Sequence, residues 1–95
     1  MARKQLEVRL AELRERVAST GAWPCDTRVR VRHTPRTEKD GTAGLTGVID
    51  VGGRWSRLSG RLKAYVIRLD QLEVHHDHAQ VRWVSARPDD IEPLG

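Results

Sequence analysis

The stretch Arg28-Val29-Arg30-Val31-Arg32 decides the fold class, because it alternates strictly between charged and apolar side chains. Successive side chains of a β-strand point to opposite faces, so the valines would lie in a core while the arginines face solvent. The stretch therefore predicts a half-buried β-strand. With 95 residues, the chain has the length of one small domain.

Further short strands are predicted toward the C-terminus. They comprise residues 45–51, 64–69 with a short continuation at 72–74, 80–84 and 91–94. The polar segment 33–44 is expected to be a long mobile loop, and the basic segment 55–63 a loop or a short strand. Residues 86–90 predict a turn of tight helix. Short strands at regular spacing with glycine-rich turns favour a small barrel or sandwich.

Before the first strand, residues 2–19 have the pattern of an amphipathic helix that ends near Gly21. The apolar stripe of this helix has 4-3-4 spacing and comprises Leu6, Leu10, Leu13 and Val17. The stripe has two interpretations: it packs on its own domain, or it is a short coiled-coil seam to another chain. We expect residues 1–20 to form this helix and residues 26–94 to form the β domain.

The order of these patterns resembles that of SH3-like barrel proteins, including the KOW type. The run 26–31 followed by Gly-Leu-Thr-Gly-Val-Ile at 44–49 is similar to the first two strands of such barrels. The segments 65–70, 81–84 and 89–94 are similar to the last strands of small bacterial members. The resemblance implies a mainly β fold: an SH3-like barrel of about five short antiparallel strands after an N-terminal amphipathic α-helix. The loop at 33–43 is longer than a KOW segment allows, so no specific family is identified.

The charges of the chain are unevenly distributed. The formal net charge is +4, but residues 28–68 carry +7 and residues 69–95 carry −4, which predicts a charge dipole. Guanidinium groups can hold phosphates, and an exposed tryptophan can stack on a base. The predicted nucleic-acid-binding residues are Arg28, Arg30, Arg32, Arg54, Trp55, Arg57, Arg61 and Lys63. The alternative is a solvated arginine face, with Trp55 packed in the core.

The sequence is therefore compatible with two functions. The first is a small non-catalytic module that binds DNA or RNA. The second is a protein-interaction or assembly module, either a homodimer or an accessory subunit of a larger complex, for which the helix stripe would supply the contact.

Other classes of function are not expected. The chain has no phosphate loop, nucleophile elbow or dinucleotide fingerprint, so we expect no enzyme, no small-molecule substrate and no cofactor. His75-His76-Asp77-His78 is interpreted as a polar hairpin tip rather than a metal site, and Cys25 as a buried structural thiol. The absence of an apolar spanning stretch and of a signal-peptide pattern predicts no membrane association and a cytoplasmic location.

Overall fold

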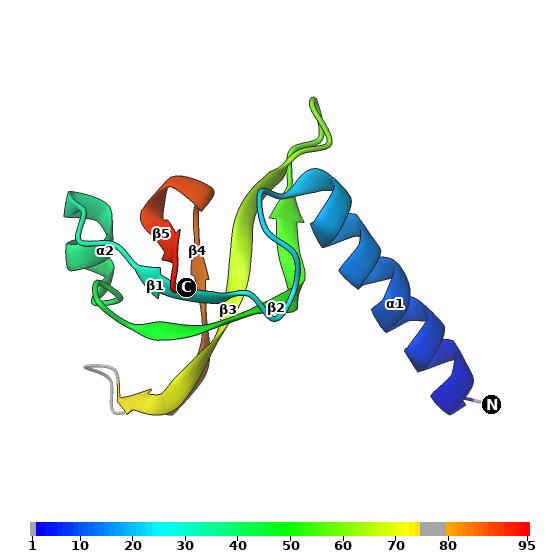
Figure 1. Cartoon of the computed structure of the whole chain (residues 1–95), viewed down its shortest axis with the longest axis horizontal. Helices are drawn as coiled ribbons and strands as arrows, with labels where there is room; N and C mark the ends of the chain where they lie inside the picture. The colour runs from blue at the N-terminus through cyan, green and yellow to red at the C-terminus, as the bar shows by residue number, and fades with distance from the viewer. Residues whose placement is uncertain (1, 75–79) are drawn as a thin grey trace.

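The structure is a computed structural model that describes residues 2–74 and 80–95. It is mainly β, with five strands in one antiparallel sheet and an N-terminal helix, as the sequence predicts (Figure 1). In chain order the elements are α1 (Ala2–Thr20), β1 (Arg28–Val31), α2 (Pro35–Asp40), β2 (Thr46–Trp55), β3 (Leu62–Val74), β4 (Gln80–Ala86), the 3-10 helix η1 (Pro88–Asp90) and β5 (Ile91–Pro93).

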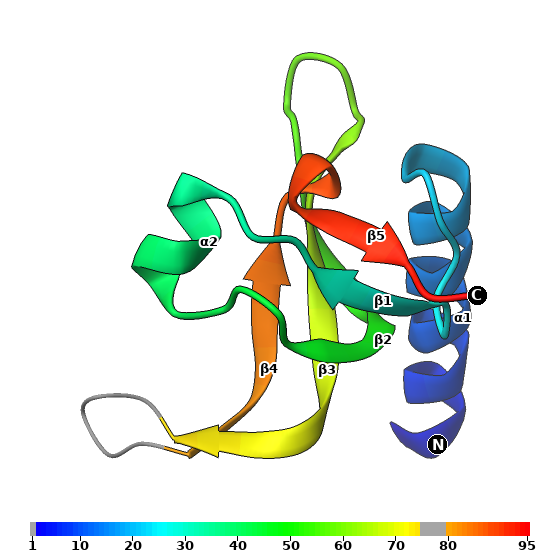
Figure 2. The ribbon, with the colours of Figure 1, turned by 60° about the vertical axis from the view of Figure 1, so that its left-hand side comes forward.

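The strand order of the sheet is β4-β3-β2-β1-β5. Strands β4 and β5 are its two edges, so pairing among the described residues does not close the sheet into a barrel. The register shifts in β2 between Ile49 and Gly53, and between β3 and β4 from Arg68 to Glu73. Such irregularities increase twist and bend a strand, and Figure 2 shows the bend of the long strand β3.

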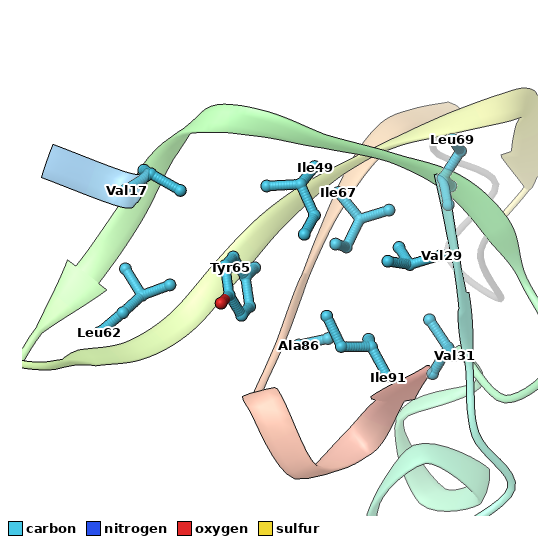
Figure 3. Close-up of a cluster of buried hydrophobic side chains, with 10 residues drawn as sticks. All are labelled: Val17, Val29, Val31, Ile49, Leu62, Tyr65, Ile67, Leu69, Ala86 and Ile91. Carbon is cyan, nitrogen blue, oxygen red and sulfur yellow. The ribbon is translucent and has the colours of Figure 1, made fainter. Parts of the chain in front are cut away.

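One hydrophobic cluster forms the core, which Figure 3 shows. The alternation in β1 is confirmed, because Val29 and Val31 are fully buried while Arg28 and Arg30 are exposed. The cluster comprises Val17, Val29, Val31, Ile49, Leu62, Tyr65, Ile67, Leu69, Ala86 and Ile91. It draws side chains from α1 and from all five strands, so the sheet curls around a single core.

The segment 33–44 is not the long loop that we predicted, because it contains the short helix α2. Thr34 caps this helix: its hydroxyl accepts a hydrogen bond from the backbone N–H of Thr37. Pro35 fits the first helical turn, where no N–H is needed, and Gly41 ends the helix in the left-handed conformation with φ 75°. The sequence signal that could have predicted this helix is Thr34-Pro35 at its start and Gly41 at its end.

Three strands, β2, β3 and β4, are longer than predicted. Strand β2 continues through Gly52 and Gly53 to Trp55, and β4 continues to Ala86. Strand β3 begins at Leu62 and includes the predicted continuation at 72–74 without a break. Two adjacent glycines are typical of a turn, but here Gly52 and Gly53 lie where the register of β2 shifts, and the strand continues past them. The predicted polar tip at residues 75–78 lies outside the described residues.

Helix α1 contacts the sheet only near its C-terminal end. Val17 is fully buried in the core, whereas Leu6 and Leu10 are 57% and 37% exposed. Figure 1 shows the N-terminal part of α1 pointing away from the sheet. Packing on its own domain therefore accounts for the apolar side chain of Val17, but not for those of Leu6 and Leu10. Within the described residues, no helix combines the length and apolar character that a bilayer crossing requires.

Candidate nucleic-acid interface

The residues predicted to bind nucleic acid lie in two groups. Arg28 and Arg30 lie on β1, with Arg32 directly after it; we call these three the β1 arginines. Arg54, Arg57, Arg61 and Lys63 lie on the ends of β2 and β3 and on the connection 56–61 between them, a unit that we call the β2–β3 hairpin. In Figures 1 and 2 this hairpin projects from the body of the molecule.

Two of the β1 arginines are already bound to carboxylates. Arg28 donates to both carboxylate oxygens of Asp70, at 2.8 and 3.2 Å. Arg30 donates through Nε and Nη2 to Oε1 of Glu92, at 2.8 and 2.6 Å. The Arg28 and Thr46 hydrogen bonds lower the pKa of Asp70, which stays ionised and neutralises its partner. These two arginines therefore offer less free charge than the sequence suggests.

The acidic C-terminal segment folds against the basic segment. Three ion pairs join the two segments: Arg28 with Asp70, Arg30 with Glu92, and Arg36 with Asp90. At these contacts the two segments meet rather than lie at opposite poles. The charge separation along the sequence is therefore not a simple separation of positive and negative charge in the folded molecule.

The β2–β3 hairpin keeps its positive charge. Residues 51–69 contain five Lys or Arg residues and no acidic residue. Arg54, Arg57, Arg61 and Lys63 are all exposed, and none of them forms an ion pair with a carboxylate among the described residues. This hairpin is therefore a basic projection of the described fold whose cations are free to meet a polyanion.

A cleft at the base of the hairpin brings in two more arginines. Arg54 of β2 lines it together with Arg36 of α2 and Arg87, which precedes η1. Nη1 of Arg36 is held at 2.8 Å from Oδ2 of Asp90, which is itself buried. The remaining lining residues are Thr37, Asp40, Thr42, Ala64, Ser85, Ala86 and Asp90. Arg36 and Arg87 were not among the predicted residues, because only the fold brings them beside Arg54.

Trp55 is engaged in packing rather than standing free on the surface. Its indole N–H donates to Oγ1 of Thr20 at 2.7 Å, and the guanidinium carbon of Arg16 lies 4.1 Å from its ring centroid. The ring also packs against the core cluster. Trp55 thus joins α1 to the hairpin, and one face of its ring is covered by Arg16.

The tryptophan that is exposed is Trp83 on β4, which the sequence analysis did not select. Its side chain is 54% exposed, it lies opposite Arg68 of β3, and its indole N–H donates to Oδ2 of Asp50 at 2.8 Å. The alternation along β4 could have identified it, since Val84 and Ala86 pack against or within the core and leave residue 83 on the outer face.

Among the described residues, no side-chain base is hydrogen-bonded to the Cys25 thiol. Its thiol is half-buried and lies 3.4 Å from the carbonyl oxygen of Asp50, and burial is the main cause that raises its pKa. The imidazole of His33 is engaged with another residue, since its Nδ1 lies 2.6 Å from Oε1 of Glu38. Among residues 2–74 and 80–95, no cluster of three or more metal-ligating side chains occurs.

The chain was compared with known proteins at three levels. No family model, no curated protein and no solved structure matches it.

Proposed function

We propose that this chain is a small non-catalytic module that binds nucleic acid, and that the β2–β3 hairpin makes the main contact. The observation that carries the proposal is the run of cations in residues 51–69 that has no acidic residue and no ion-pair partner in the described fold. Free guanidinium groups bind phosphate oxygens, and the displaced counterions favour association. Arg54 and Arg87, which line the cleft and form no ion pair in the described fold, would hold an adjacent phosphate.

We also place the domain among the SH3-like barrels. The order β4-β3-β2-β1-β5, the antiparallel pairing of β1 with both β2 and β5, and the 3-10 helix before β5 support this assignment. In such a barrel the connections between strands carry the binding residues, which agrees with an interface on the β2–β3 connection.

The test measures fluorescence anisotropy of labelled duplex DNA, single-stranded DNA and RNA over a series of salt concentrations. The wild type is expected to bind at low salt and to weaken steeply as salt rises. The variant Arg57→Gln/Arg61→Gln removes two free cations. It should lower the affinity at least about tenfold and reduce the slope of log K against log salt by about 2.

The matched control is Arg28→Gln/Arg30→Gln, which removes the same charge from side chains that are already paired. Its loss of affinity should be clearly smaller. Equal losses would show that the hairpin is not the main contact, and absence of binding to every nucleic acid at low salt would overturn the proposed function.

A second candidate function rests on the exposed stripe of α1. We infer from Leu6 and Leu10, which the domain leaves largely uncovered, that an assembly module is the alternative. Light scattering on the wild type and on Leu10→Asp separates the two candidates. A dimer that Leu10→Asp dissociates supports assembly, whereas a folded monomer in both cases rules out this coiled-coil seam.

A further inference from the structure

The most exposed large apolar side chain of the described chain is Leu58, at the tip of the β2–β3 hairpin. It is 100% exposed and contacts no part of the core. Figures 1 and 2 show the connection that carries it as a projecting end of the molecule. An apolar side chain gains nothing by such a position in the free protein, so we ask what partner would cover it.

The tip is held in shape by its own hydrogen bonds. The backbone N–H of Ser56 donates to the carbonyl oxygen of Arg61, and that of Gly60 to the carbonyl oxygen of Ser56, both at 2.9 Å. The hydroxyl oxygen of Ser56 accepts from the N–H groups of Leu58 and Ser59, at 3.2 and 3.3 Å. Leu58 is therefore presented on an ordered turn, so that its burial would cost little backbone entropy.

The surroundings of Leu58 point to a polyanion with an apolar interior. Arg57 precedes it, Arg61 follows within the same turn, and Arg54 and Lys63 lie on the two strands below. Phosphates on both sides of an apolar surface would match this arrangement. Duplex DNA has that design, with stacked bases between two charged backbones.

We propose that Leu58 is an apolar wedge that enters between base pairs of duplex DNA and kinks it, while the hairpin cations hold the flanking phosphates. The proposal rests on the proposed function and names its partner as duplex DNA. Proteins that bend DNA in this way insert one apolar side chain at a base step and use the bend to bring more of their surface into contact.

Two other partners fit the hairpin less well. Single-stranded nucleic acid is held mainly by stacking on aromatic side chains, and the aromatic ring of this hairpin, Trp55, is covered by Arg16 and bound to Thr20. A lipid surface needs more apolar area than one side chain supplies, and Leu58 lies in a connection that is otherwise polar.

The test compares the wild type with Leu58→Ala on a short duplex that carries a donor and an acceptor dye at its ends. The wild type should raise energy transfer by bending the duplex. Leu58→Ala should lose most of this change and bind about tenfold more weakly. Its salt dependence should stay unchanged, because the phosphate contacts remain. Leu72→Ala removes a leucine that is also exposed, at 53%, from β3, and it should behave as the wild type.

The outcomes separate the wedge from the proposed function. The wedge is overturned if the protein binds the duplex tightly and salt-dependently without bending it, or if Leu58→Ala bends it as much as the wild type. Either result leaves the proposed function standing. Failure of every nucleic acid to bind at low salt overturns both. Binding to anionic phosphatidylserine vesicles that Leu58→Ala abolishes, without an effect of Leu58→Ala on duplex bending, overturns the wedge in favour of a membrane contact.

Discussion

Tyr65 joins two parts of the molecule through one hydroxyl group. Its ring is fully buried in the core, and its hydroxyl oxygen accepts hydrogen bonds from the backbone N–H groups of Ala22 and Trp23. These two residues belong to the segment between α1 and β1. The single buried tyrosine therefore fixes the path by which the helix enters the sheet.

We expect Tyr65→Phe to destabilise the fold without changing its core. The ring is kept, but two partly buried donors lose their acceptor, which costs about 1–3 kcal/mol. For a domain of this size such a loss lowers Tm by several degrees, on the order of 4–8 °C per kcal/mol. Thermal unfolding followed by circular dichroism measures it. Leu58→Ala is the control, because that side chain is fully exposed, and a Tm of Tyr65→Phe equal to that of the control would contradict the role of the hydroxyl.

Cys25 gives a second prediction at the level of one residue. Burial raises the pKa of its thiol above the ordinary value, so little thiolate is present at neutral pH, and the thiolate is the reactive form. We expect slow labelling by a disulfide reagent in the native protein and rapid labelling in urea at the same pH. Equal rates in both conditions would show that the half-buried position does not protect the thiol.

At the scale of the element, α1 is divided between two environments. Val17 is fully buried, whereas Leu6, which belongs to the same stripe, is 57% exposed. The guanidinium of Arg14 adds an exposed ion pair to Asp26, with Nη1 and Oδ2 at 2.8 Å. Only the C-terminal part of the helix is thus anchored to the sheet, and the stability of the domain should depend on that part.

Val17→Ala should lower the free energy of unfolding by about 1–3 kcal/mol, because it removes buried methyl groups and leaves a cavity. Leu6→Ala should change it by less than about 0.5 kcal/mol, as is usual for an exposed site. Urea unfolding measures both. If Leu6→Ala lowers the free energy of unfolding as much as Val17→Ala does, a second chain covers the stripe in solution. The free energy of unfolding should then depend on protein concentration.

The secondary structure was predictable where side-chain periodicity carries the signal. The alternation in residues 28–32 identified β1, and the leucine spacing together with Gly21 identified α1. Helix α2 was missed because six residues are too few to show a helical period, and its capping threonine and first-turn proline are local signals. The extent of β2 was missed because Gly52-Gly53 has the composition of a turn but lies at a shift of register within the strand.

The whole molecule is less compact than its length suggests. The Cα radius of gyration is 14.0 Å, against about 12 Å for a compact domain of this size. The excess agrees with the two projecting parts, the N-terminal half of α1 and the β2–β3 hairpin (Figure 1). These are also the two parts on which the proposed functions rest.

The candidate site was only partly predictable, because charge in space depends on which residues the sheet brings together. The predicted binding residues include the basic residues of β1 and of the hairpin alike. The antiparallel pairing of β1 with β5 sets Arg30 beside Glu92, and that partner lies far along the chain. No local pattern distinguishes a paired arginine from a free one, so the distinction between the paired Arg28 and Arg30 and the free hairpin cations required the fold.

The ion pairs that join the two halves of the chain should make its stability sensitive to acid. Hydrogen bonds from Arg28 and Thr46 lower the pKa of Asp70 in the folded state below its value in the unfolded chain. The unfolded chain therefore takes up the proton first, and the contribution of Asp70 is complete above its unfolded pKa and disappears as pH falls through the folded pKa. Wild type and Asp70→Asn should differ most in urea midpoint near neutral pH and converge in acid. A difference that grows on acidification would show that Asp70 stabilises the fold in its protonated form.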